Sequence, residues 1–174
     1  TIGVVRLSQL NRDLETFATV RTTELIESAT LLENVTKSAI QMRNLLLFDD
    51  QKQVKAEIAA VQAASEANKA ILDRLNKQVT PGKMQELFKA VLDTRATYVP
   101  QQDELLKIAD SGDHATAKDL MLGRVLQSQL RYIGAIKHFS DNVVEETRQD
   151  AQKAHDNFSS GRAMIISLAV LALL

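Results

Sequence analysis

The sequence predicts an all-α fold, an antiparallel up-down-up-down four-helix bundle, and three observations support this. The 174 residues include only two prolines, six glycines and no cysteine or tryptophan, while residues that favour helices dominate. Hydrophobic residues make up 45% of the chain, which is enough for a core. Apolar residues recur at alternating three- and four-residue steps between a few turn signals, a pattern typical of packed helices.

The first two helices are expected on either side of Asp49 and Asp50, whose side chains can cap the second helix. The first is expected over residues 4–48, with a buried seam of Leu25, Ser28, Leu32, Val35, Ala39, Met42 and Leu46. The second keeps the same register, with a seam of Val54, Ile58, Val61, Ser65, Asn68, Leu72, Leu75 and Val79.

The last two helices are expected on either side of residues 111–113, where Gly112 suits a left-handed C-cap and Asp113 an N-cap. The third helix should start at Thr80-Pro81, a capping threonine before a first-turn proline. Its seam comprises Met84, Phe88, Val91, Arg95, Tyr98, Gln102 and Leu105. The fourth is expected over residues 114–160, with a seam of Met121, Val125, Ser128, Tyr132, Ala135 and Phe139.

The predicted helix lengths and the two chain ends suggest a membrane-proximal stalk. At ~1.5 Å per residue the first and last helices are each about 70 Å long and the middle two about 45 Å. Residues 2–7, apart from Arg6, and residues 163–174 are mostly apolar. The second run is shorter than the roughly 20 residues of a spanning helix, so it can be a core helix or part of a membrane helix. We expect the latter, because it lacks a polar face. The expected organisation is a bundle over residues 1–160 and the truncated start of a second transmembrane helix over residues 161–174.

Seven polar seam residues are expected at one level of the bundle. Counted at ~1.5 Å per residue, this level lies about 25 Å from the turns near residues 49 and 112. Buried seam positions are usually aliphatic, so such a cluster is informative. Arg95 cannot lose its proton, and burying it without an anion costs several kcal/mol. No acidic residue occupies the seam of the second, third or fourth helix at this level. The predicted ligand-binding residues are Arg95, Tyr98, Gln102, Ser65, Asn68, Ser128 and Tyr132.

We interpret this layer as a pocket for an anion from solution, most simply a carboxylate that Arg95 binds bidentately. The neutral side chains around it would supply hydrogen bonds to the remaining oxygens. Pro100, in the middle of the third helix, frees the carbonyl of Ala96 and should bend the helix there. In the structural alternative, single polar residues fix the helix register, and Arg95 reaches solvent or pairs with a glutamate off the seam. Weaker candidates for anion binding are Arg21, Arg43 and Arg131.

The sequence also excludes several function classes. A net charge of -1 gives no electrostatic footprint for nucleic acid. The chain has no glycine-rich phosphate loop, no His-Glu-x-x-His motif and no Glu-x-x-His pair, and its three histidines lie too far apart to share a metal. Without cysteine or histidine near the polar layer, nucleophilic and acid–base catalysis lack their usual agents. We therefore expect no enzyme activity, no cofactor and no metal.

Two segments resemble the sensor domains of bacterial methyl-accepting chemotaxis proteins. They are Leu92-Asp93-Thr94-Arg95-Ala96-Thr97-Tyr98-Val99-Pro100-Gln101-Gln102 and Ser111-Gly112-Asp113-His114-Ala115-Thr116-Ala117. The Arg-x-x-Tyr-x-Pro spacing and the Gly-Asp turn carry the resemblance, which covers essentially the whole chain. It implies a periplasmic ligand-binding domain of a homodimeric receptor in the bacterial inner membrane, attached to signalling segments absent from this chain. Arg95 and Tyr98 match positions that often contact ligand in such domains.

The resemblance also implies a ligand class, because similar receptors detect amino acids or small organic acids. This seam lacks the several arginines of an aspartate-type pocket between subunits. We therefore expect a di- or tricarboxylate such as malate, succinate or citrate, bound among the second, third and fourth helices of one bundle. The ligand would favour one helix arrangement over another, and the fourth helix would carry the shift across the membrane. Open alternatives are an aromatic-acid or amino-acid sensor, a histidine-kinase sensor domain, and a purely structural membrane-anchored bundle.

Overall fold

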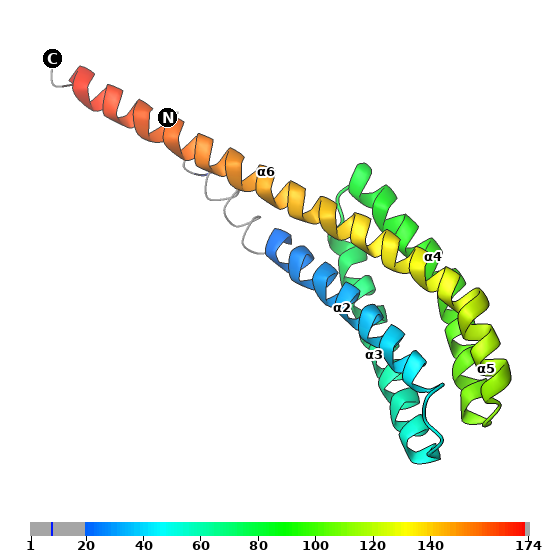
Figure 1. Cartoon of the computed structure of the whole chain (residues 1–174). Coiled ribbons are helices and arrows are strands. Elements are labelled where there is room, and N and C mark those ends of the chain that lie inside the picture. Colours follow the sequence, from blue (N-terminus) through cyan, green and yellow to red (C-terminus); the bar gives the residue numbers. More distant parts are fainter. Residues whose placement is uncertain (1–7, 9–19, 173–174) are drawn as a thin grey trace. The chain divides into compact units, whose positions relative to one another are not determined.

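The computed structural model describes Ser8 and residues 20–172, and it describes side chains as far as residue 160. All regular structure among these residues is helical (Figure 1). The chain divides into two compact units, which are described separately. The larger comprises residues 27–141, and the smaller comprises residues up to Ile26 together with those from Asn142 onward.

Four helices with antiparallel packing form a four-helix bundle, which confirms the predicted fold class. Alternation of direction follows from the short turns that join the first three helices and lead into the fourth. The elements are α2 (Thr22–Asn44), α3 (Gln51–Gln78), α4 (Lys83–Asp110), α5 (His114–Leu120), the π-helical segment η2 (Met121–Val125) and α6 (Leu126–Ala172). The last three are continuous and together form the fourth helix of the bundle.

The core of the larger unit follows the predicted seams in part. Buried positions outside the seams include Leu31, Leu45 and Ile136, and the predicted positions that are only half-buried include Leu32, Leu46, Ile58, Val79 and Ala135. Burial of these aliphatic and aromatic side chains is the main favourable term for the fold, at about 25 cal/mol per Å² of apolar surface. Phe88 and Phe139 pack with their ring centroids 5.5 Å apart. The seam residues that are buried include Val35, Ala39, Met42, Val54, Val61, Leu72, Leu75, Met84, Phe88, Val91, Leu105, Met121, Val125 and Phe139.

Three of the predicted turn signals are confirmed. The side chain of Asp50 accepts a hydrogen bond from the backbone N–H of Lys52 and caps α3. Asp113 accepts one from the backbone N–H of Thr116 and caps α5. Gly112 has a φ of 83°, a conformation that side chains with a Cβ rarely adopt, so the chain reverses there at low cost.

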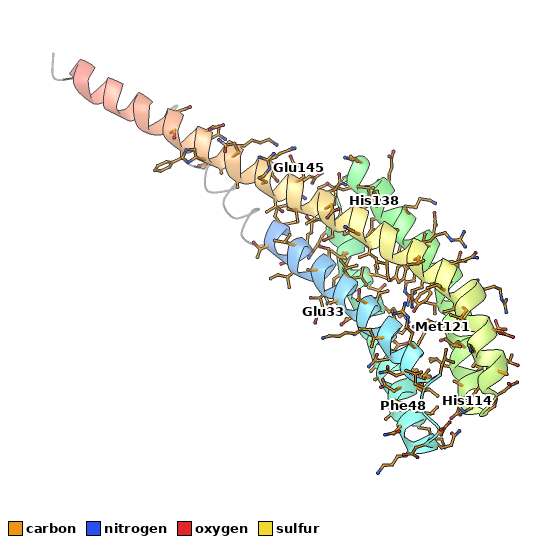
Figure 2. All side chains as sticks on the ribbon, viewed as in Figure 1. Glu33, Phe48, His114, Met121, His138 and Glu145 are labelled. Carbon is orange, nitrogen blue, oxygen red and sulfur yellow. The ribbon has the colours of Figure 1, made fainter. Side chains whose placement is uncertain are left out.

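The turn after α2 and the turn after α4 lie at the same end of the larger unit. The position of a Cβ on Gly112 would be 3.8 Å from the side-chain nitrogen of Gln51. Figure 2 shows Phe48, in the first of these turns, and His114, the first residue of α5 after the second turn, at that end. The predicted depth of the polar layer was counted from these two turns.

Two predicted helix boundaries are wrong. The first helix ends at Asn44 rather than at residue 48, because the backbone hydrogen bonds of Leu46 and Leu47 tighten to three-residue spacing. The third helix starts at Lys83 and not at Thr80-Pro81. Its N-cap is Gly82, whose φ of 105° is incompatible with a helix, so helical conformation begins only after it.

The fourth helix is not the uninterrupted α-helix that was expected. Residues Met121–Val125 form a π-helical segment between α5 and α6. The hydrogen bonds of such segments span five residues instead of four, so they accommodate one inserted residue, and they are often found at functional sites. By contrast, α4 passes through Pro100 without a break.

The predicted membrane-facing ends are only partly covered by the described residues. Residues 2–7 lie outside them. The backbone of α6 is helical through Ala172, but the side chains of residues 161–172 lie outside the description. As far as the structure is described, no helix combines the length and apolarity needed to cross a membrane. The division at residue 160 therefore stays a prediction.

Candidate functional site

Six of the seven predicted site residues surround one small cavity inside the larger unit. Its volume is about 10 Å³, which is room for about one water molecule. Helices α2, α3, α4 and α6 all contribute, as the equal depth of their polar residues predicted. The cavity is lined by Val35, Ser38, Ser65, Asn68, Arg95, Tyr98, Val99, Gln102 and Tyr132.

A larger groove runs along the surface between α3 and α4 and shares a wall with this cavity. Its volume is about 640 Å³, within the usual range for small-molecule sites. Arg95 is among the residues common to both, so its guanidinium lies between the interior and a solvent-open groove. The groove is lined by Ile58, Gln62, Ser65, Glu66, Lys69, Arg95, Val99, Gln102, Asp103, Leu106, Lys107 and Asp110.

Arg95 forms no ion pair with any carboxylate that the structure describes. Its neighbour is Tyr132, whose buried hydroxyl has no hydrogen-bond partner of normal geometry among the described residues. Burial raises the pKa of Tyr132 to about 12, although the nearby charge of Arg95 acts in the opposite direction. At neutral pH Tyr132 is thus a protonated phenol, a hydrogen-bond donor beside a cation.

Tyr98 is the centre of a buried network that links three helices. Its hydroxyl oxygen accepts hydrogen bonds from the side-chain amides of Gln102, at 3.0 Å, and Gln129, at 3.3 Å. Its own proton faces the sulfur of Met42, 3.9 Å away. Burial raises the pKa of Tyr98 to about 12, with the Gln129 hydrogen bond lowering it in part. The rings of Tyr98 and Tyr132 lie 5.5 Å apart, so both hydroxyls belong to one polar layer.

Two further predicted site residues, Asn68 and Ser128, have hydrogen-bond partners. The side-chain amide of Asn34 donates to the side-chain oxygen of Asn68 at 2.9 Å, which joins α2 to α3. Ser128 is buried but does not line the cavity. Its hydroxyl lies 2.7 Å from the side-chain oxygen of Gln101 and 3.0 Å from the carbonyl of Arg124. Ser128 therefore packs α6 against α4 beside the layer.

Sequence reasoning missed three residues of this region. Ser38 lines the cavity three residues after Val35, a spacing that places both on one helix face, so the signal was present. Val99 lines the same cavity next to Tyr98. Gln129 is only 1% exposed. It directly follows Ser128, a predicted seam residue, and the helical period does not place two successive residues on the same face. Its burial could therefore not be predicted. The weaker candidates Arg43 and Arg131 are exposed and lie outside the cavity.

Among the described residues, the larger unit thus holds a buried layer of neutral hydrogen-bond donors beside Arg95, a cation with no carboxylate partner there, and this arrangement suits the binding of a small anion. The comparison with known families agrees. Residues 1–158 match the family described as four helix bundle sensory module for signal transduction, and the chain belongs to this family. It is a non-enzymatic family of methyl-accepting chemotaxis proteins, whose sensory module is typically periplasmic. No curated protein matches the chain.

Proposed function

We propose that this sensory module detects a small organic acid, one carboxylate of which binds Arg95. The observation that carries the proposal is the charge balance around Arg95. A guanidinium beside a buried polar layer has no carboxylate partner among the described residues, while Tyr132 and Tyr98 stay protonated next to it. An anion from solution would satisfy the guanidinium bidentately and accept a hydrogen bond from Tyr132.

The size of the cavity couples binding to helix movement. About 10 Å³ holds one water and no organic acid, so an acid that binds Arg95 from the groove can enter the polar layer only if the helices separate. A ligand shifts a conformational equilibrium by as much as its affinities for the two states differ. An acid that binds the opened layer better than the closed one therefore biases the bundle, which is the event a signalling module requires.

The charges of the groove narrow the ligand class. Lys69 and Lys107 line the groove with Arg95 and can bind a second carboxylate, which favours a dicarboxylate such as malate or succinate, or citrate. Glu66 and Asp103 line the same groove and can bind an ammonium group. An amino acid, with its carboxylate at Arg95, is therefore the second candidate.

The first test is a thermal-shift screen of the 174-residue chain in mild detergent against C4-dicarboxylates, citrate, benzoates and amino acids. A ligand at a hundredfold excess over its dissociation constant should stabilise the protein by about 2.7 kcal/mol. Arg95→Ala should abolish the shift, whereas Arg131→Ala, an exposed arginine on α6, should preserve it. A shift that survives Arg95→Ala would move the binding site elsewhere, and no shift with any compound would favour a structural bundle.

A second set of variants separates the two ligand classes. Replacement of Lys69 and Lys107 by glutamine should weaken a dicarboxylate and leave an amino acid almost unaffected. Replacement of Glu66 and Asp103 by glutamine and asparagine should do the reverse. Isothermal titration of each variant with succinate and with aspartate or serine distinguishes these outcomes. Equal loss in both sets would show that neither pair contacts the ligand.

We also propose that the module works as a homodimer, anchored in the bacterial inner membrane and facing the periplasm. One observation supports the dimer. Two large apolar side chains are exposed at the end of the larger unit, Ile40 (53%) on α2 and Leu47 (77%) in the turn after it, and a second copy would cover them. Replacement of both by lysine should lower the dimer fraction measured by sedimentation. If the dimer survives this double variant, another surface forms it.

A further inference from the structure

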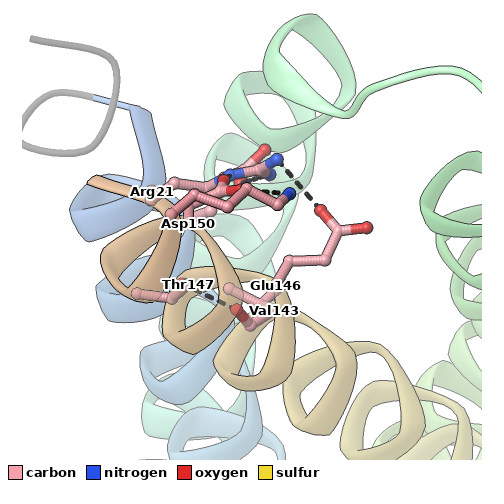
Figure 3. Close-up of polar contacts among 7 residues, drawn as sticks. Arg21, Val143, Glu146, Thr147 and Asp150 are labelled. Atoms are coloured by element: carbon pink, nitrogen blue, oxygen red, sulfur yellow. Dashed lines mark hydrogen bonds and ion pairs between the residues drawn. The ribbon is translucent and has the colours of Figure 1, made fainter. Parts of the chain in front are cut away.

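The smaller unit contains a charged cluster that the ligand site does not involve (Figure 3). The guanidinium of Arg21, directly before α2, contacts three carboxylates. Glu24 lies 2.8 Å away on α2, and Glu146 and Asp150 lie 3.0 and 2.9 Å away on α6. The ion pairs of Glu146 and Asp150 connect the start of α2 with α6.

Glu24 differs from the other two carboxylates in its burial. Its side chain is 0% exposed, whereas those of Glu146 and Asp150 are each 32% exposed. One oxygen of Glu24, Oε2, bonds to Arg21, and the other, Oε1, is buried without a hydrogen-bond partner among the described residues. A buried carboxylate oxygen without a donor is costly when the group is charged. A proton on that oxygen lowers this cost, because a neutral carboxyl group is much cheaper to bury than a carboxylate.

Among the described residues, the cluster has fewer positive charges than carboxylates. One guanidinium faces three carboxylates, which leaves a net charge of -2 when all are ionised. Lys153 is 3.3 Å from Asp150 but on the exposed side, where its charge is screened. Among the neighbouring charges, Glu145 and Arg148 on α6 pair with each other, and Glu27 on α2 pairs with Arg74. Each of these pairs is neutral, so the excess negative charge stays on Glu24, Glu146 and Asp150.

The titration behaviour of the cluster agrees with this geometry. Burial raises the pKa of Glu24; Arg21 acts against this, and the charges of Glu146 and Asp150 raise it further. Burial acts to lower the pKa of Arg21, but its hydrogen bonds with Glu24 and Asp150 outweigh this, so the pKa of Arg21 is raised on balance. Arg21 therefore stays charged while Glu24 is the group that can gain a proton.

We propose that this cluster is a proton-binding site, in which Glu24 takes up a proton from the medium and strengthens the attachment of the start of α2 to α6. When Glu24 is ionised, it competes for Arg21 and repels Glu146 and Asp150. When it is neutral, the charge of Arg21 is balanced by the two α6 carboxylates alone, so the ion pairs between the helices become stronger. The site would give the module a second input, pH, which is independent of the proposed carboxylate ligand.

The sign of the pH effect follows from the direction of the pKa shift. A carboxyl whose pKa is higher in the folded than in the unfolded chain stabilises the fold fully below its unfolded pKa. This contribution is lost as the pH rises through the folded pKa. The glutamine of Glu24→Gln is neutral at every pH, so this variant should keep that stabilisation when the pH rises. The variant should therefore melt about 2–4 °C above the wild type near pH 8 and close to it near pH 5.

The first experiment compares melting temperatures of the 174-residue chain in mild detergent between about pH 5 and about pH 8. Glu33→Gln is the matched control, since Glu33 lies exposed on the same helix and Lys37 lowers its pKa. That control should show no gain at higher pH. Parallel curves for the wild type and Glu24→Gln would overturn the proposal.

Two direct readouts keep the proposal testable if the glutamine variant packs poorly. In NMR spectra of chain labelled with ¹³C in the glutamate carboxyls, Glu24 should titrate at a higher pH than Glu33; titration at or below the pH of Glu33 would refute the site.

The chain has no cysteine, so Ile26→Cys and Ala151→Cys, both exposed, can carry spin labels. Their distance distribution should narrow at acidic pH in the wild type and stay narrow at every pH in Glu24→Gln. A distribution independent of pH would refute the coupling to helix attachment. Arg95→Ala should leave all these effects unchanged, which separates this site from the proposed ligand site.

Discussion

Two arginines of this chain have opposite surroundings. Arg95, in the larger unit, faces protonated phenols and amides and has no carboxylate partner among the described residues. Arg21, in the smaller unit, contacts three carboxylates at once. At the first site no described carboxylate pairs with the arginine, and at the second the described carboxylates outnumber it. The comparison teaches that charge balance around a partly buried arginine, more than its burial, indicates whether a site will take up an anion or a proton.

The largest expected difference between the two sites appears when each arginine is neutralised. Arg21→Gln leaves three carboxylates without their cation and should lower the free energy of unfolding by about 2–3 kcal/mol near pH 8, less than for a fully buried pair. The loss should shrink near pH 5, where protons replace the missing charge. Arg95→Gln should change the free energy of unfolding by only about 0.5 kcal/mol when no ligand is present. Urea unfolding at both pH values measures these changes, and equal losses would contradict the comparison.

A smaller difference is expected between the two tyrosines of the polar layer. Tyr98→Phe leaves the amides of Gln102 and Gln129 without their acceptor, which should cost about 1–3 kcal/mol. Tyr132→Phe removes a hydroxyl that has no partner of normal geometry among the described residues, so it should be neutral or slightly stabilising. It should nevertheless weaken carboxylate binding. Thermal unfolding with and without ligand tests both, and a costly Tyr132→Phe would mean that Arg95 donates a hydrogen bond to this hydroxyl.

The alkaline stability of the bundle should depend on the same two tyrosines. Burial raises the pKa of each to about 12, so the unfolded chain loses these protons at lower pH than the folded chain. Stability is then fully present below about pH 10 and falls as the pH approaches about 12. Ultraviolet absorbance should show phenolate only in that range or on unfolding. Phenolate near pH 10 in folded protein would show that the layer is open to water.

The smallest effect is expected at Ser128. Because its hydroxyl bonds outside the cavity, Ser128→Ala should change ligand affinity less than twofold and stability by about 0.5 kcal/mol. Calorimetric titration against the wild type measures the affinity. A tenfold loss would place Ser128 in the ligand site, as the sequence predicted.

The bundle and its polar layer could be predicted because both depend on the helical period. Residues three and four apart share a face, so Arg95, Tyr98 and Gln102 had to lie together once α4 was recognised. The depth of the layer followed from counting residues from the capped turns at Asp50 and Asp113. Short-range capping rules therefore fixed the long-range alignment of the helices.

The features that were missed depend on information outside that period. Thr80-Pro81 is a good start signal, but the positive φ of Gly82 delays the helix, and sequence alone does not reveal φ. The burial of Glu24 and Glu27 beside arginines was not predicted, because acidic residues are usually solvated and no sequence pattern marks these two as exceptions. Gln129 is buried after the wide π-helical turn, which changes the face that the following residues present.

The π-helical segment also affects which changes in chain length the fourth helix can tolerate. An α-helix has 3.6 residues per turn, so removal of one residue rotates everything after it by about 100° and turns the core face outward. Within Met121–Val125 the backbone already accommodates an extra residue. Loss of Leu122, which is 60% exposed, would restore an ordinary α-helical turn and leave the downstream register unchanged. This segment is therefore the one described part of that helix where a single-residue deletion is compatible with the same core.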